Sequence, residues 1–234
     1  MFSSGYFIII IGFMVLSGTV GFILKRKFNK FSEEPSAAGL TGREIAEKML
    51  SDYGIHDVKV TCVPGQLTDH YNPIAKTVNL SESVYHESNA AAAAVAAHEC
   101  GHAAQHANAY RWLKFRSAMV PVQTVSGMLL NIIMFGSIFI GAIFYEIFPY
   151  QNVLLILTIS YGAMALFSLV TLPVEFDASK RALVWIQNSG TATHGEYQKA
   201  KSALNWAATT YVVAALGAIT TMLFFLLQFL GADE

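Results

Sequence analysis

The sequence predicts a mainly α-helical, polytopic membrane protein with four transmembrane helices and a small α+β part in the cytoplasm. Of the 234 residues, 54% are hydrophobic and 13% are charged, and this charged fraction is about half that of an average soluble domain. Four long stretches contain no charged residue and no histidine, and every Lys and Arg lies between those stretches. These observations together predict the fold class.

Each of the four uncharged stretches is long enough to cross a bilayer, which takes roughly 18–20 apolar residues in a helix. No positive segment precedes the first stretch and no small-residue cleavage site follows it, so we expect a retained anchor and not a signal peptide. We expect Pro121 to open the second helix and residues 146–152 to form a tight outer loop. The stretches are Tyr6–Leu24, Ser117–Tyr145, Val153–Val174 and Trp206–Leu230.

The positive charges predict the orientation of the chain. All 15 Lys and Arg lie in Lys25–Arg116 and Lys180–Lys201. Because cytoplasmic loops carry the excess of positive residues, we expect both segments in the cytoplasm and both termini outside. The chain is then a multi-pass protein of a cell membrane, which in bacteria is the inner membrane. The net charge of −1 gives no basic surface for nucleic acid.

The predicted organisation has five parts. Residues 1–24 form an N-terminal anchor, and 25–116 form the first cytoplasmic part. Residues 117–174 form a transmembrane helical hairpin, and 175–205 form a second cytoplasmic segment. Residues 206–234 form the fourth transmembrane helix with a short outer tail. Two cysteines without a disulfide framework fit the reducing cytoplasm.

Local patterns predict a linker and an amphipathic helix at the start of the first cytoplasmic part. The polar run Lys25–Gly39 is typical of a linker. Thr41 and Glu44 then form a capping-box pattern, which predicts the start of a helix. Gly54 is expected to end this helix. Its expected apolar face consists of Ile45, Met49 and Tyr53.

Two short alternating runs predict a small sheet. "VKVTCV" at Val58–Val63 and "TVNLS" at Thr77–Ser81 are both rich in β-branched residues. The segment "LTDHYNP" between them ends in an Asn-Pro turn signal. "TVNLS" is either an edge strand that pairs with an extended peptide or an ordinary strand. We expect Cys62 to lie in the core.

An alanine-rich run from Asn89 to Ala109 predicts a helix capped by Ser88 or Asn89. It contains "HECGH", the H-E-x-x-H pattern, in which His98 and His102 lie one turn apart on the same face. Two such imidazoles can hold one Zn²⁺. Glu99 can take a proton from an activated water and pass it to a leaving amine. The alternative is a pair of hydrogen-bonded helix histidines without a metal.

A catalytic zinc needs a third protein ligand. His106 lies eight residues after His98, about 12 Å further along the helix and roughly 80° around it. We therefore expect His106 to support a ligand, face substrate or be structural. Glu175 follows the third uncharged stretch on the same predicted side, so it is the expected third ligand, unless it is a solvated charge at the membrane boundary. Asp177 is the rival carboxylate, and about 200° of helix rotation lets only one of the two face the metal.

The sequence says less about the roles of the other polar residues near the predicted site. Cys100 lies about 200° around the helix from His98, so we expect it to pack and not to react. An oxyanion needs a hydrogen-bond donor, and the sequence does not choose among several cytoplasmic candidates. These candidates are His70, Tyr71, Arg181, His194 and Tyr197.

Two runs of sequence resemble a known family. "LTDHYNP…KTVNLSESVYHESNAAAAAVAAHECGHAAQHA" and "LPVEFDASKRALVWI" resemble the YugP-type membrane zinc metallopeptidases of bacteria, and the resemblance extends from about Ser36 to the fourth uncharged stretch. It implies an integral membrane protease with Zn²⁺, and we expect the cytoplasmic α+β part to be catalytic and zincin-like. By this resemblance His98, His102 and Glu175 are metal ligands and Glu99 is the catalytic base.

A more remote similarity concerns the HtpX and Ste24 membrane proteases. Those proteins carry an E-x-x-x-D helix whose Asp orients a ligand histidine through a hydrogen bond. Here the position four after Glu175 is Ser179. Ser179 itself, Asp69 or Asp177 are the candidates for that supporting role.

We therefore expect a membrane-embedded zinc endopeptidase that cuts protein or peptide substrates, themselves membrane-associated, near the cytoplasmic membrane face. One alternative is a zinc hydrolase of a non-peptide amide or ester with the same site. Another is a catalytically inactive, metal-bound scaffold for membrane partners, against which the intact Glu99 argues. The sequence determines neither the substrate nor the oligomeric state.

Overall fold

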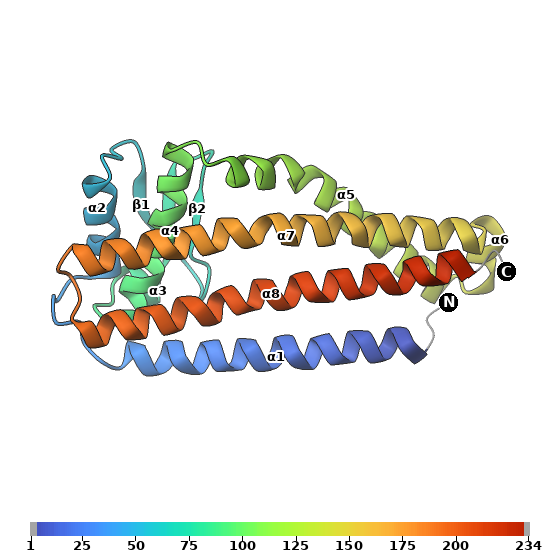
Figure 1. Cartoon of the computed structure of the whole chain (residues 1–234), viewed down its shortest axis with the longest axis horizontal. Coiled ribbons are helices and arrows are strands. Elements are labelled where there is room, and N and C mark those ends of the chain that lie inside the picture. The colour runs from blue at the N-terminus through green and yellow to red at the C-terminus, as the bar shows by residue number, and fades with distance from the viewer. Residues whose placement is uncertain (1–3, 232–234) are drawn as a thin grey trace. The chain divides into compact units, whose positions relative to one another are not determined.

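The computed structural model describes residues 4–231, and this part of the chain is mainly helical (Figure 1). Its elements in order are α1 Ser4–Ser32, α2 Gly42–Asp52, β1 Lys59–Val63, β2 His70–Asn72, β3 Thr77–Ser81, α3 Glu82–Tyr85, α4 Ala90–Ala107, α5 Arg111–Phe139, α6 Ala142–Ile147, α7 Tyr150–Asn188 and α8 His194–Leu230.

The described residues form two compact units. The first comprises residues 4–18, 114–172 and 211–231, and the second comprises residues 19–113 and 173–210. Helices α1, α5, α7 and α8 each contribute residues to both units. Within residues 4–231, four helices are long and apolar enough to cross a membrane: α1, α5, α7 and α8. This number agrees with the sequence prediction.

Two of these helices begin or end at other residues than the sequence predicted. Helix α1 continues to Ser32, so the first part of the expected linker is helical. Its last turns are amphipathic, because Phe28 and Phe31 pack against Ala91 and Ala203. Helix α7 runs without a break from Tyr150 to Asn188 and therefore joins the third uncharged stretch to the segment that carries Glu175.

The predictions for the second uncharged stretch were also partly wrong. Helix α5 begins at Arg111 and continues through Pro121, which does not open it. A helix that crosses a bilayer gains from continuing through a proline, because backbone groups have no water to bind there. The helix ends before Gly141, which has a positive φ of 59°. The expected outer loop is mostly helical, because α6 and α7 include all of it except Phe148 and Pro149.

The first unit is held together by apolar and aromatic side chains. Tyr161 stacks on Phe225 with ring centroids 5.6 Å apart, and the Tyr6 hydroxyl lies 3.4 Å from that of Tyr161. The buried residues of this cluster are Tyr6, Ile133, Phe144, Val153, Leu154, Leu157 and Phe225. The described buried polar residues of this unit are all uncharged, as expected for helices that lie in a bilayer: Ser126, Ser160, Thr171 and Thr221.

The second unit contains a small sheet with strand order β1-β3-β2 in the described chain. Strand β3 pairs in parallel with β1 and antiparallel with β2. Strand β2 is three residues long and lies in the segment that was predicted as a turn. The strand "TVNLS" is β3 and is central, so the edge-strand interpretation was wrong. Cys62 on the edge strand β1 is exposed, not in the core as expected.

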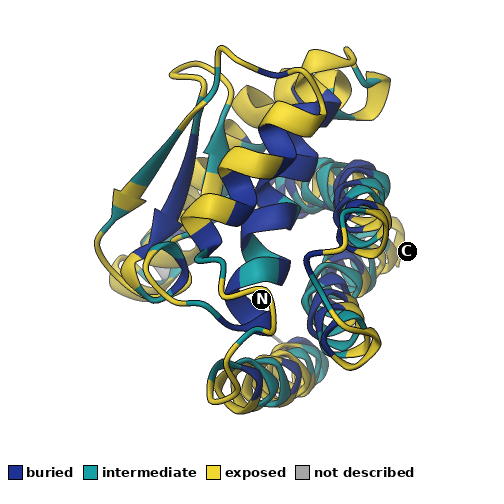
Figure 2. Cartoon of the chain, turned by 90° about the vertical axis from the view of Figure 1, so that its left-hand side faces the viewer, coloured by how far each residue is buried: buried dark blue, intermediate teal, exposed yellow. Residues whose placement is uncertain are grey.

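Helices α2 and α4 pack on each other and form the core of this unit with β3. The predicted capping box of Thr41 and Glu44 is confirmed. Ile45 and Met49 are buried as expected. Tyr53 is exposed instead, because it is the C-cap residue and lies beyond the last helical turn. Figure 2 shows buried residues on the inner sides of these helices and strands.

Candidate metal centre

The H-E-x-x-H segment lies in α4, whose start is fixed by Asn89. The Asn89 side chain accepts a hydrogen bond from the Ala92 N–H at 2.8 Å, so the predicted cap is confirmed. Gly101 then brings α4 against α7. A Cβ at Gly101 would lie 2.5 Å from the carbonyl oxygen of Ala178. Only glycine therefore allows this approach, which places the α7 residues beside the histidines.

Three side chains converge where the two helices meet. One oxygen of Glu175, Oε2, lies 3.4 Å from Nε2 of His98 and 3.6 Å from Nε2 of His102. The ligand atoms of these residues all lie within 4.8 Å of one another. Two ligand atoms bound tetrahedrally to zinc at ordinary bond lengths are separated by about 3.4 Å. The geometry therefore fits one metal ion held by two imidazoles and a carboxylate.

Each histidine is held by its other ring nitrogen. Nδ1 of His98 lies 3.2 Å from the Ser179 hydroxyl, and Nδ1 of His102 lies 3.1 Å from Oε1 of Gln105. The two Nε2 atoms are thus directed to Glu175, while both Nδ1 atoms have partners on the other side. Such outer hydrogen bonds fix the orientation of histidine ligands in metal sites.

The two aspartates that were candidates for this support lie in different places. Asp69 accepts hydrogen bonds from the Ser81 N–H at 2.7 Å and from the Ser81 hydroxyl at 3.1 Å, so it holds the end of β3. Asp177 accepts from Nε2 of Gln105 at 2.9 Å and from Nε of Arg181 at 2.6 Å. Asp177 therefore reaches His102 through Gln105, whereas Ser179 contacts His98 directly.

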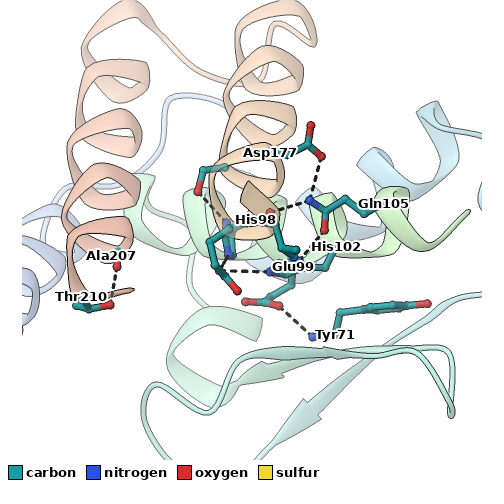
Figure 3. Close-up of polar contacts among 11 residues, drawn as sticks. Tyr71, His98, Glu99, His102, Gln105, Asp177, Ala207 and Thr210 are labelled. Carbon is teal, nitrogen blue, oxygen red and sulfur yellow. Dashed lines mark hydrogen bonds and ion pairs between the residues drawn. The ribbon is translucent and has the colours of Figure 1, made fainter. Parts of the chain in front are cut away.

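Glu99 lies between the histidines and strand β2, as Figure 3 shows. Its Oε2 accepts a hydrogen bond from the backbone N–H of Tyr71 at 2.9 Å, and the residue is 8% exposed. The sheet edge thus positions the carboxylate next to the three converging side chains. The carboxylate is placed where it can exchange a proton with a molecule held there.

His106 and Tyr71 form a separate pair. The Tyr71 hydroxyl lies 2.7 Å from Nδ1 of His106, and in Figure 3 the Tyr71 ring extends away from Glu99. His106 is exposed and does not belong to the convergent group. Tyr71 therefore ties β2 to α4 twice, through its backbone to Glu99 and through its hydroxyl to His106.

The remaining oxyanion candidates are placed as follows. Nδ1 of His70 lies 2.7 Å from the Thr68 carbonyl, and Nε2 lies 3.1 Å from the Asn79 amide. Arg181 pairs with Asp177 at 2.6 Å. His194 lies 3.5 Å from Gln198 in the first turns of α8, and the partly buried Tyr197 packs against the core of the second unit. None of these side chains belongs to the group of three that converges at Glu175.

The groups around His102 favour the charged form of its imidazole. Burial disfavours a charged imidazole, but the contacts with Glu175, the charge of Glu99 and the hydrogen bond with Gln105 together raise the pKa of His102 above its ordinary value. For the neighbouring Cys100 the neutral form is favoured instead, because burial, with the charge of Glu99, raises the pKa of its thiol. Cys100 packs against Ala46 of α2, with its Sγ 3.6 Å from that carbonyl, as expected for an unreactive residue.

Gln105 is the residue of the site that sequence reasoning missed. It is completely buried, and its side chain contacts His102, Val174 and Asp177. The signal in the sequence was a single amide three residues after His102 in a run of alanines. Because three and four residues make about one helical turn, that spacing puts the amide beside the imidazole.

The chain is similar to known proteins over nearly its whole length. Residues 6–230 match the family described as "Putative neutral zinc metallopeptidase". The chain is 37% identical over 220 residues to the "Putative membrane protease YugP" of Bacillus subtilis (strain 168), and the match covers 94% of each chain. No solved structure matches the chain.

Proposed function

Because the chain belongs to the "putative neutral zinc metallopeptidase" family, we propose that it is a membrane-anchored zinc endopeptidase that hydrolyses peptide bonds near the cytoplasmic face of the membrane. The observation that carries this proposal is the convergence of two imidazole Nε2 atoms on one oxygen of Glu175, at 3.4 and 3.6 Å. His98, His102 and Glu175 are the proposed ligands, and they leave the open position that a catalytic zinc requires.

Bound zinc would supply Lewis-acid activation of a water and of the scissile carbonyl. The protein supplies the base. Glu99 uses Oε2 to accept the Tyr71 N–H at 2.9 Å, so its other oxygen is available to take a proton from the attacking water. The same carboxylic acid then gives this proton to the leaving amine. The low exposure of Glu99 limits competition from bulk water.

Strand β2 is the proposed position for a peptide substrate. It is an edge strand of the described sheet, and the Tyr71 N–H points away from β3 toward Glu99. The Tyr71 N–H is already donated to Glu99, so an extended peptide would pair with the other outward backbone groups of this edge and would lie along the catalytic carboxylate. The substrates proposed here are protein segments that are extended and close to a bilayer.

The orientation in the membrane rests on the charges. All 15 Lys and Arg fall in the two segments between the uncharged stretches, which supports a cytoplasmic site and outer termini in the bacterial inner membrane. A reporter enzyme that is active only outside the cytoplasm tests this, fused after Glu234 in one case and after Gly190 in the other. Activity from the Gly190 fusion and none from the Glu234 fusion would reverse the topology.

The activity is tested with the full chain, purified in detergent with zinc. Wild type should cleave unfolded casein, and Glu99→Gln should reduce the turnover by about 10²–10⁴-fold, the usual contribution of a general base. Glu99→Gln should bind as much zinc as wild type. Equal cleavage by both forms at equal zinc content contradicts the proposal. Turnover confined to small ester and amide substrates supports the non-peptide hydrolase instead.

A further inference from the structure

Gln105 is a polar side chain with no exposure at all, and it lies directly behind a proposed zinc ligand. We propose that Gln105 is a positioning residue that fixes the metal-facing nitrogen of His102 and connects that imidazole to Asp177. This inference rests on the proposed zinc site, and it assigns a role to residues outside the ligand set.

The hydrogen bonds of Gln105 determine which way its amide points. Nε2 lies 2.7 Å from the Val174 carbonyl oxygen and 2.9 Å from Oδ2 of Asp177. Both partners only accept hydrogen bonds, so the NH₂ group must face them. The carbonyl oxygen Oε1 is therefore the atom that faces His102, at 3.1 Å from Nδ1.

The orientation of the amide in turn determines the tautomer of His102. An amide oxygen only accepts, so Nδ1 of His102 must carry the proton that it donates. In a neutral imidazole Nε2 then keeps its lone pair. Nε2 is the atom that lies 3.6 Å from Glu175, so the lone pair is directed to the place where the three ligand atoms converge.

The hydrogen-bonded chain from His102 through Gln105 to Asp177, called the relay below, is anchored in α7. Asp177 is a charged acceptor, which makes a stronger hydrogen bond than a neutral group, and Arg181 holds it at 2.6 Å. The Gln105 amide is thus fixed at two points of α7, Val174 and Asp177, on either side of Glu175. Within residues 4–231, Nδ1 of His98 is held instead by the Ser179 hydroxyl, which can rotate. Of the two imidazoles, His102 is therefore the more firmly oriented.

Zinc affinity tests this role without depending on peptide cleavage. Gln105→Leu keeps the approximate size of the side chain and removes all three hydrogen bonds. It should raise the dissociation constant for zinc, measured by chelator competition, by roughly 10–100-fold, as loss of an outer-shell partner does. Gln105→Glu keeps an acceptor but loses both donors and faces Asp177, so it should bind zinc weakly too. Asn108→Ala is the matched control, because Asn108 donates to the Ala104 carbonyl on the same helix; its zinc affinity should equal that of wild type.

A double-mutant cycle separates a relay from general packing. Asp177→Ala alone should weaken zinc binding, and Gln105→Leu combined with Asp177→Ala should bind no more weakly than Gln105→Leu. If the two substitutions raise the dissociation constant for zinc independently, so that their effects multiply, the relay is overturned. It is also overturned if Gln105→Leu keeps the wild-type zinc affinity and only lowers the unfolding temperature of the metal-free protein. If Gln105→Leu does not fold, Asp177→Ala tests the relay by itself, because Asp177 is partly exposed and its replacement is better tolerated. Unchanged zinc affinity in Asp177→Ala overturns the relay.

The failures of the two proposals are distinguishable. Wild type that binds zinc with the same affinity as the variants overturns the relay and leaves the zinc site intact. Weaker zinc binding by the variants, with no cleavage of casein by wild type, supports the relay and contradicts the peptidase. Wild type that binds no zinc overturns both.

Discussion

The two buried faces of α4 differ in what their polar atoms do. On the face toward α7, Gly101 allows a close approach, and the side chains of His98, His102 and Gln105 all have partners on that helix or on one another. On the face toward α2, Cys100 packs against Ala46 among small apolar side chains. Both faces are buried, so burial alone does not mark the site.

The two faces differ in whether hydrogen bonds fix the directions of their polar atoms. Every ring nitrogen on the α7 face has a defined direction, which is what a metal site requires. The α2 face contributes apolar packing, whose cost on substitution depends on volume and not on direction. Substitutions on the first face should therefore change metal binding, and substitutions on the second should change only stability.

The largest effect is expected from Glu175→Ala, which removes the carboxylate on which both imidazoles converge. Its dissociation constant for zinc should rise by more than the roughly 100-fold that loss of a supporting partner costs. Metal content after dialysis and chelator competition measure this. His106→Ala is the matched control, because His106 contacts the Tyr71 hydroxyl instead, and it should keep its zinc. Full zinc content in Glu175→Ala would place the third ligand elsewhere.

Gly101→Ala should have the next largest effect. The added Cβ would lie 2.5 Å from the Ala178 carbonyl, so α4 and α7 must separate. We expect a loss of roughly 1–3 kcal/mol in the free energy of unfolding, as for an overpacked core, together with weaker zinc binding. Gly127→Ala is the control, because a Cβ there meets no atom within 4 Å. Unaltered zinc affinity in Gly101→Ala would show that this approach does not position the ligands.

On the α2 face, Cys100→Ala should destabilise the protein modestly. Removing one buried sulfur costs about 1 kcal/mol, comparable to a buried methylene, and thermal unfolding of the metal-free protein measures it. Zinc affinity should not change, since Cys100 faces α2. A clear loss of zinc affinity in Cys100→Ala would contradict the proposed difference between the two faces.

The smallest effect concerns thiol reactivity. Cys62 is exposed and Cys100 is buried, and burial raises the pKa of Cys100, so little reactive thiolate forms there near neutral pH. A maleimide should label one thiol in the native protein and two after denaturation. The variant Cys62→Ser should remain unlabelled until it unfolds. Rapid labelling of native Cys62→Ser would mean that the packing of α4 on α2 opens readily.

The sequence predicted the four apolar helices, the capping box at Thr41 and the α4 helix, because each depends on local pattern. It missed β2, which is three residues long and ends at Asn72 before a proline. It also misplaced the ends of α1 and α5. The end of α1 depends on a tertiary contact, Phe31 against Ala203, that no local pattern encodes. Helix α5 continues through Pro121, which a local pattern places at a helix start.

For the candidate site, periodicity brought His98 and His102 to one face and excluded His106 from it. Glu175 followed from the charge pattern together with a family resemblance, and the structure brings it within reach of both histidines. Gln105 was not predicted, because its role depends on the α7 groups that face it. An isolated amide in an alanine helix carries no signal until its partners are known.

Glu175 follows His102 by 73 residues in the chain. At a synthesis rate of about 5–20 residues per second, roughly 4–15 seconds separate the two on the ribosome. A nascent chain therefore carries Glu99 and the two histidines before Glu175 exists, and the proposed site is complete only when α7 has been made and packed on α4. The order of translation thus delays completion of the proposed site until the second unit has assembled.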